Sequence, residues 1–356
     1  VGSTQSRRLA LRAARESIVL LKNDRRVLPL PRDARVLVTG PACDSLPALN
    51  NGWTITWQGD RPAEYPADRR TVRRAIETRL GARATYRPGV DFAKTIDVPA
   101  AVEAARASDV VVACLGEASY AETPGNIDEL TLPDAQLRLA QAIADTGKPM
   151  VLVLIEGRPR IIRTIADAAS AVVLALNPGM EGGAALADVL FGDVNPDGKL
   201  PITYPRFANA LTTYDRKKSQ EPLPGFAPAM GYAPQFEFGF GLSYTTFEYS
   251  KLTAMPDAAA VGVPIDISVR VRNSGSRAGA EVVQLFVSQH AARVTPPVRR
   301  LKRFAKVTLQ PNEAREVVFH LAKRDFSYVD AGGGLVSEPG AFTVLVGGLA
   351  KEVVFR

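Results

Sequence analysis

Residues 110–115 read VVVACL and residues 150–155 read MVLVLI, two uninterrupted apolar runs in a sequence of 356 residues. The runs at Val36–Thr39 and Ala171–Leu176 have the same character. None of them alternates apolar with polar residues, as a strand with one wet face would. Continuous apolar strands are typical of a sheet that helices cover on both faces.

Helical patterns separate these runs. We expect helices over 5–22, Thr71–Leu80, Ala100–Ala107, Asp134–Asp145 and Gly182–Leu190, and a short strand over Ala84–Tyr86. The alternation of strand and helix predicts an α/β sandwich with a mostly parallel sheet between helices. In such sheets ligands bind beyond the carboxyl ends of the strands, here the loops after Thr39, Leu115, Ile155 and Leu176.

The second half of the sequence has a different hydrophobic pattern. Segments such as IDISVRVRN and EVVQLFVS alternate apolar with polar residues, and Gly, Pro and Asn separate them at short intervals. This pattern predicts an all-β, immunoglobulin-like sandwich of about 100 residues. We therefore expect an α/β sandwich domain over 1–205, an extended connector over 206–250 lying on that domain, and the β-sandwich over 251–356.

Composition excludes several classes of protein. The net charge of +7 comes from scattered basic residues, and the densest cluster, at 299–303, lacks interleaved aromatic residues. A solvated surface is favoured over a nucleic-acid interface. The apolar runs are too short to cross a membrane. The sequence begins Val-Gly-Ser-Thr, without Met, so we expect a processed or partial chain.

Cysteine and histidine are scarce. Cys43 and Cys114 lack metal-ligand spacing, and we expect buried free thiols. His290 and His320 both lie in the predicted β-sandwich, which excludes a Ser-His-Asp or Cys-His system, or a histidine-rich zinc site, from the α/β domain. A dinucleotide fingerprint and a P-loop are also missing, so we expect no cofactor and no metal.

Carboxylates remain as candidates for chemistry. The loop 116–129, which leaves the strand 110–115, carries Glu117, Glu122, Asp128 and Glu129. A general acid needs a carboxyl group near a leaving group and partly shielded from water, and a loop at a strand end can provide both. From the residues alone, a solvated loop whose acids cap the next helix is the stronger interpretation.

The two tryptophans of the chain, Trp53 and Trp57, lie in the segment NGWTITWQG over 51–59. This segment is predicted to be a loop, where an exposed indole leaves apolar area in water. Sugar rings stack on indoles, so a carbohydrate platform is one interpretation. Packing of both rings on the domain is the other.

These motifs occur in a recognisable order: NGWTITWQG, GEASYAETPGN, LTLPDAQ, NPGMEGGAALADVLFGDVNPDGKLPITYP, FGFGLSYTTFEYS and PPVRRLKRFAKVTLQPNEAREVVFHL. Together they resemble the C-terminal part of glycoside hydrolase family 3, the β-glucosidase and exo-1,3/1,4-β-glucanase family. The resemblance runs from about residue 5 to residue 348. It implies an α/β sandwich domain followed by a fibronectin type III-like domain.

The resemblance also implies a function. Family members hydrolyse terminal non-reducing β-D-glucosyl residues of β-glucans or cello-oligosaccharides with retention, through a glycosyl-enzyme intermediate. The general acid/base maps to Glu122, with Glu117 as its rival. The tryptophan that clamps the leaving-group sugar maps to Trp57, with Trp53 as its rival. The expected location is periplasmic or extracellular.

The sequence also departs from the family pattern in one respect. Family members carry their aspartate nucleophile on an N-terminal (β/α)8 barrel, which this sequence does not contain. Retaining catalysis needs two carboxyl groups, so we expect the chain alone to be inactive. A non-catalytic carbohydrate-binding or scaffold module is the main alternative. A nucleotide-dependent α/β enzyme is disfavoured by the missing glycine fingerprint.

Overall fold

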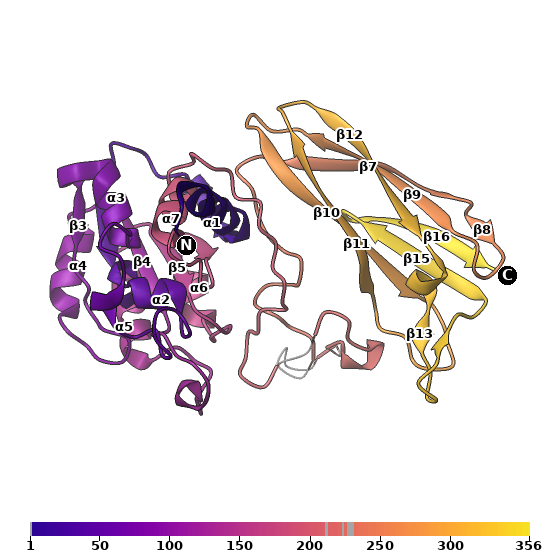
Figure 1. The fold of residues 1–356 in the computed structure, drawn as a ribbon, viewed down its shortest axis with the longest axis horizontal. Helices are drawn as coiled ribbons and strands as arrows, with labels where there is room; N and C mark the ends of the chain where they lie inside the picture. Colours follow the sequence, from indigo (N-terminus) through magenta and orange to yellow (C-terminus); the bar gives the residue numbers. More distant parts are fainter. Residues whose placement is uncertain (1, 211–212, 223, 226–230) are drawn as a thin grey trace. The chain divides into compact units, whose positions relative to one another are not determined.

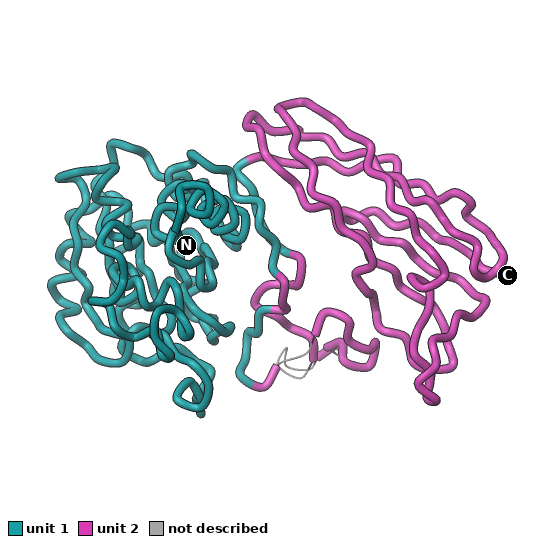
Figure 2. The backbone as a smooth tube through the Cα atoms, in the orientation of Figure 1, with its two compact units in different colours: residues 1–200, 204–208, 240–244 teal, residues 201–203, 209–239, 245–356 magenta. Residues whose placement is uncertain are grey.

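The computed structural model describes residues 2–210, 213–222, 224–225 and 231–356. These residues form two compact units (Figure 2). The first comprises residues 1–200, 204–208 and 240–244, and the second comprises 201–203, 209–239 and 245–356. Among the described residues, no helix is long and apolar enough to cross a membrane.

The first unit is built on a sheet with strand order β1-β6-β5-β4-β2-β3, of which Figure 1 labels β3, β4 and β5. Its strands are β1 (Val19–Asn23), β2 (Val36–Thr39), β3 (Ala84–Tyr86), β4 (Val110–Gly116), β5 (Met150–Ile155) and β6 (Ala171–Leu174). All neighbours pair in parallel except β1, which is antiparallel to β6. Every residue of β2, β4, β5 and β6 is buried, which confirms the expectation drawn from their continuous apolar sequence.

Helices cover both faces of this sheet. The helices are α1 (Thr4–Ser17), α2 (Leu46–Asn50), α3 (Val72–Leu80), α4 (Val98–Arg106), α5 (Asp134–Ala144), α6 (Arg163–Ala168) and α7 (Gly182–Leu190). Helices α1, α2, α3 and α7 share one hydrophobic core with alternate strand residues such as Val112 and Val153. The intervening strand residues are buried as well, and α4 packs on α5, which packs on α6.

The helix expected over 5–22 is too long. Helix α1 ends at Ser17, and Ile18 has extended backbone angles. Residues 19–23 instead form β1, whose Val19 pairs with Leu174. Residues 18–21 are all buried, and a surface helix could bury only one of its faces. Tertiary pairing therefore ends the helix where the sequence becomes continuously apolar.

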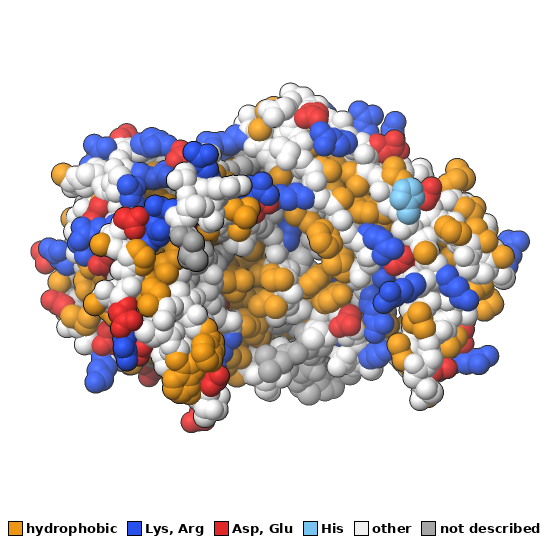
Figure 3. All heavy atoms as spheres, in the orientation of Figure 1, with side chains coloured by type: hydrophobic (Ala, Val, Ile, Leu, Met, Phe, Trp, Pro, Cys, Tyr) orange, Lys and Arg blue, Asp and Glu red, His pale blue; other side chains and the backbone are white. Residues whose placement is uncertain are grey.

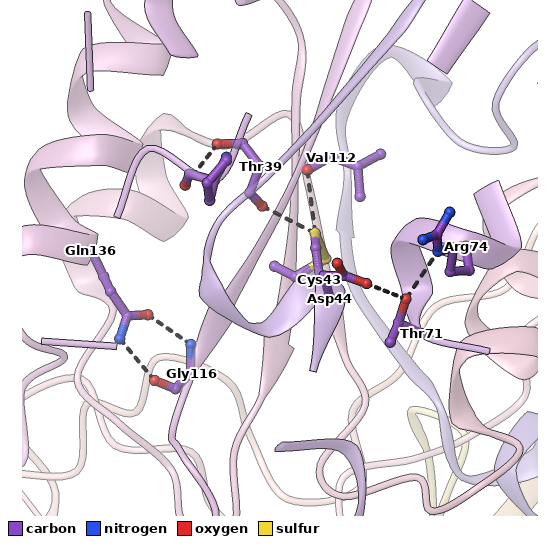
Figure 4. The surroundings of a disulfide bond; sticks show 10 residues. Thr39, Cys43, Asp44, Thr71, Arg74, Val112, Gly116 and Gln136 are labelled. Carbon is purple, nitrogen blue, oxygen red and sulfur yellow. Dashed lines mark hydrogen bonds between the residues drawn. A yellow bond between two sulfur atoms is a disulfide. The ribbon is translucent and has the colours of Figure 1, made fainter. Parts of the chain in front are cut away.

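The two cysteines correct another expectation. Cys43 and Cys114 form a disulfide rather than two free thiols (Figure 4). Cys43 lies in the 3-10 turn Pro41–Asp44 that follows β2, and Cys114 lies in β4, the neighbour of β2. Their Cα atoms are 5.0 Å apart, within the range that a disulfide spans. The sequence separation of 71 residues hides this proximity.

The second unit is a β-sandwich. One sheet has strand order β11-β10-β15-β16-β8 and the other β12-β9-β7. The strands are β7 (Phe247–Met255), β8 (Ala258–Ala259), β9 (Ile265–Asn273), β10 (Gly279–Gln289), β11 (Arg300–Leu309), β12 (Ala314–Leu321), β15 (Gly340–Val346) and β16 (Leu349–Phe355), and a separate ribbon pairs β13 (Tyr328–Val329) with β14 (Leu335–Val336). Alternate residues of β9 are buried, as predicted.

The stretch expected to be a connector is divided between the units. Residues 204–208 and 240–244 belong to the first unit, whereas the described part of 209–239 belongs to the second. This differs from the expectation that the whole stretch lies on the first domain. Strand β7 also begins at Phe247, inside that stretch.

On the face drawn in Figure 3, basic and acidic side chains are interspersed rather than gathered into one patch of a single charge.

Candidate active site

Loops from four neighbouring strands meet at the carboxyl edge of the first unit's sheet. They follow β2, β4, β5 and β6. The Asn51 side chain, after β2, donates to the Asn177 side-chain oxygen, after β6, at 3.2 Å, and the hydrogen bonds described below connect the other loops. This edge is where parallel sheets bind ligands. All the candidate residues of the first unit, Glu117, Glu122, Trp53 and Trp57, lie on the loops after β2 and β4.

Glu122 is exposed on the loop that leaves β4. Its backbone has φ 53° and ψ −143°, a conformation that few non-glycine residues adopt, and it precedes the 3-10 turn Thr123–Gly125. Among the described residues, no hydrogen bond or ion pair reaches its carboxylate. The carboxylate is therefore accessible to a bound molecule.

Glu117 has the opposite environment. Its side chain is only 9% exposed and lies between two guanidinium groups, with Oε1 2.8 Å from Arg158 Nε and 3.1 Å from Arg160 Nη1. Oε2 accepts hydrogen bonds from the backbone N–H groups of Gly157 and Arg158 and from the Tyr120 hydroxyl. A carboxylate with five donors is tied to the protein and has little capacity left for substrate.

The ring of Tyr120 is part of the same cluster. The Arg158 guanidinium carbon lies 4.1 Å from the ring centroid, a cation–π contact. Burial raises the pKa of the Tyr120 hydroxyl, and the Glu117 charge raises it further, so the hydroxyl stays a donor. Glu117, Arg158 and Tyr120 together hold the first half of the loop against the segment that follows β5.

The tryptophan loop, residues 51–59, turns tightly on itself. Asn51, Trp53 and Ile55 all have positive φ, and the Trp53 N–H donates to the Trp57 carbonyl at 2.8 Å. These turns direct the side chains outward: Trp53 is 70% exposed, Ile55 51% and Trp57 48%. The interpretation that both indoles pack on the domain is wrong. An exposed apolar platform of this kind is a candidate binding surface.

The tryptophan loop and the Glu122 loop are directly bonded to each other. The Gln58 side chain donates to the Ala121 carbonyl and accepts from the Ala121 N–H, both at 3.0 Å. The Asn51 side chain accepts from the Tyr120 N–H at 2.8 Å, and the Gly52 N–H donates to the Tyr120 carbonyl at 3.2 Å. A Cβ on Gly52 would lie 2.3 Å from that carbonyl, so only glycine permits this approach.

A buried acid lies under this cluster. Glu156 follows β5, is fully buried, and accepts a 2.6 Å hydrogen bond from the Tyr204 hydroxyl. Burial raises its pKa to about 8, and the nearby Glu117 charge adds to the shift. Its second oxygen, Oε2, has no hydrogen-bond partner among the described residues. This is the environment of a carboxyl group that stays protonated at neutral pH.

Sequence reasoning missed several of these residues. The strand-end rule pointed to the loop after Ile155, but nothing in it singled out Arg158, Arg160 or Glu156. Gln58 and Asn51 stood inside the quoted tryptophan motif, yet only its indoles suggested a role. A glutamine beside an aromatic platform gives no signal until the loop that it binds is known.

Comparisons with known proteins agree with this architecture. Residues 18–244 match the glycosyl hydrolase family 3 C-terminal domain, and residues 281–350 match a fibronectin type III-like domain. The chain is 36% identical to a lysosomal beta glucosidase of Dictyostelium discoideum, over 98% of this chain and 44% of that protein. It is 34% identical to a periplasmic beta-glucosidase of Salmonella typhimurium, over 96% of this chain and 48% of that protein.

Solved structures give the same result. A beta-glucosidase from Listeria innocua, in complex with isofagomine, superposes with a TM-score of 0.91 at 29% identity, covering all of this chain and 51% of that one. The chain therefore spans about half the length of the relatives that it matches. By sequence match and by structure, the chain belongs to glycosyl hydrolase family 3, of which it contains the C-terminal domain and the fibronectin type III-like domain.

Proposed function

We propose that this chain supplies the general acid/base, Glu122, to a retaining β-glucosidase whose nucleophile lies on a barrel domain outside this sequence. The observation that carries the proposal is the pairing of an exposed carboxylate with an exposed indole platform through Gln58. It distinguishes Glu122 from Glu117, whose carboxylate is already occupied by Arg158 and Arg160.

The chemistry divides into two steps. Glu122 would protonate the glycosidic oxygen while the nucleophile forms the glycosyl-enzyme, and would then remove a proton from the water that hydrolyses it. The two carboxyl groups must approach to about 5–5.5 Å. The barrel domain and the substrate would also shield Glu122 from water, as a general acid requires.

Trp57 and Trp53 would hold the sugar on the leaving-group side. The names of the chain's relatives suggest the substrate class without fixing it. Beside the beta-glucosidases, a beta-xylosidase of Formosa agariphila is also 34% identical to this chain. As the substrate, we favour terminal non-reducing β-D-glucosyl residues of β-glucans or cello-oligosaccharides.

The Cys43–Cys114 disulfide and the lysosomal and periplasmic relatives support an oxidising compartment, and we favour the periplasm or the extracellular space.

The test uses this chain and a barrel half from the same enzyme added in trans. The isolated chain should show no turnover, and the mixture should hydrolyse aryl β-glucosides. In the mixture, Glu122→Gln should spare the first step on activated aryl glucosides, lose activity on substrates with poor leaving groups, and be accelerated by azide.

Asp128→Asn, an exposed carboxylate on the same loop, is the matched control and should behave as wild type. Full activity of Glu122→Gln on poor leaving groups would refute the assignment. Turnover by the isolated chain would refute the division of the active site.

The exposed indoles also favour a second function, that of a carbohydrate-binding module. Glucan binding to the isolated chain, measured by calorimetry and lost in Trp57→Ala, would support it. Such a module would bind tightly without the barrel.

A further inference from the structure

The second unit contains a small hollow that the proposed function does not use. Its walls come from strands β10, β11, β13 and β15 (Figure 1) and from the 3-10 turn Lys323–Phe326. Among the residues that line it are Gln289, Arg300, Lys302, Asp325, Phe326 and Tyr328. Its free volume is about 30 Å³, enough for a few water-sized atoms and too small for a sugar ring.

A β-bulge at Lys302 lies beside this hollow. In the pairing of β10 with β11, Leu301 lies opposite Phe286 and Arg303 opposite Leu285, so Lys302 has no opposite residue. In a regular strand, consecutive side chains point to opposite faces, and a bulge is the device that redirects one of them. Lys302 lines the hollow, and so does Asp325, the carboxylate that pairs with the neighbouring Arg303.

The nearest carboxylate does not neutralise Lys302. Asp325 receives both ends of the Arg303 guanidinium at 2.6 Å and the Ala322 N–H at 2.9 Å. Within the described part of the chain, no carboxylate lies within ion-pair distance of the Lys302 ammonium. Burial lowers the pKa of this ammonium, which is the cost of desolvating a cation without a close partner.

Two further donors in the hollow lack acceptors. The Gln289 Nε2 and the Tyr328 hydroxyl are both buried, and neither has a hydrogen-bond partner among the described residues. The Tyr328 hydroxyl remains a donor, because burial raises its pKa and a hydrogen-bonding interaction with the nearby Glu338 carboxylate, short of a full hydrogen bond, raises it further. Glu338 is itself paired with Arg293 at 3.1 Å. Buried donors of this kind are normally satisfied, by protein, water or a ligand.

The remaining charge near the hollow is positive. Arg300 also lines it and comes only within 3.9 Å of Asp215, at the limit of an ion pair. The floor is apolar, since Phe326 and Phe342 pack edge to face with ring centroids 5.3 Å apart. An apolar floor below a cation and two neutral donors suits a planar acceptor that carries one negative charge.

We infer that this hollow binds a small carboxylate anion, held by Lys302, Gln289 and Tyr328. The anion would bring acceptors to the two unpartnered donors and an opposite charge to the ammonium. It would connect β10 and β11 with β13, and so stabilise the second unit independently of the glycosidase site.

The test is a titration of the ¹⁵N-glutamine-labelled chain with sodium acetate, with sodium chloride at the same ionic strength as the reference. The Gln289 side-chain amide signal, assigned with Gln289→Leu, should shift saturably with acetate and not with chloride. In Lys302→Met, the half-saturation concentration should rise at least about tenfold, because a charge-assisted contact is lost.

Lys306→Met is the matched control, since Lys306 lies on the same strand, is exposed and does not line the hollow. It should leave the half-saturation concentration unchanged. Tyr328→Phe keeps the ring and removes one donor, so it should raise the half-saturation concentration of acetate several-fold. This variant also tests the site if Lys302→Met does not fold. A shift that never saturates, or equal half-saturation in wild type and both variants, would show that the hollow holds only water.

Discussion

Gln58 forms two hydrogen bonds with the backbone of Ala121, one from each end of its side-chain amide, both at 3.0 Å. The next residue after Ala121 is Glu122. Together with the hydrogen bonds of Asn51 and Gly52 to Tyr120, Gln58 therefore holds the tryptophan loop and the loop of the proposed acid/base in one geometry. A shift of either loop would move the indole platform and the carboxylate relative to each other.

We expect Gln58→Leu to lower kcat/KM of the barrel-complemented enzyme by about tenfold or more, because small misplacements of a catalytic group are costly. The substitution leaves the Ala121 N–H and carbonyl without these partners. Steady-state kinetics on an aryl β-glucoside would measure the effect. Gln141→Leu, on the exposed face of α5, should match wild type, and equal kinetics for both variants would remove Gln58 from this role.

Glu117→Gln should act on stability. Removing the charge leaves Arg158 and Arg160 partly buried without their carboxylate, and breaking such a pair costs about 3–5 kcal/mol. Denaturant unfolding of this chain should show a loss of about 3 kcal/mol, whereas the exposed Glu103→Gln should show almost none. Activity of the complemented variant should not respond to azide. Azide rescue without a loss of stability would identify Glu117 as the acid/base.

Reduction of the disulfide should destabilise the first unit. Cys43 and Cys114 close a loop with a separation of 71 residues, for which the chain-entropy relation gives about 4 kcal/mol. The midpoint of thermal unfolding should fall on addition of a thiol reductant. The double variant with Cys43→Ala and Cys114→Ala should have a low midpoint that reductant does not change. A reductant-insensitive wild type with two titratable thiols would contradict the pairing.

Stability should fall as the pH rises from about 4.5 to 8 because of Glu156. Its folded pKa of about 8 lies above the usual value of 4.5, so the folded state retains a proton that the unfolded state releases across this window. This contribution to stability is fully present below pH 4.5 and is lost toward pH 8, with a slope of at most about 1.4 kcal/mol per pH unit. Glu156→Gln has no such proton.

The difference in unfolding free energy between wild type and Glu156→Gln should therefore change with pH across the window. Denaturant melts at pH 5, 6.5 and 8 would measure it. A constant difference would mean that Glu156 is ionised in the folded protein throughout.

The sequence by itself determined the layers of both units. Apolar runs such as residues 110–115 can be satisfied only where helices cover both faces of a sheet, and the alternation in β9 can be satisfied only in a sandwich. It also determined which loops meet, because the carboxyl ends of parallel strands share one edge. These patterns and the family resemblance indicate the motifs 51–59 and 116–129 as candidates.

Only the tertiary structure decided what depends on contacts between distant residues. Ile18–Leu21 suit a buried helix or a strand, and pairing with β6 made residues 19–23 a strand. The sequence does not indicate that Cys43 and Cys114 pair, because only the pairing of β2 with β4 brings them together. Glu117 and Glu122 are alike in sequence, five residues apart on one loop. The arginines after β5 bind the first and leave the second exposed, because a side chain's surroundings are set by residues far along the chain.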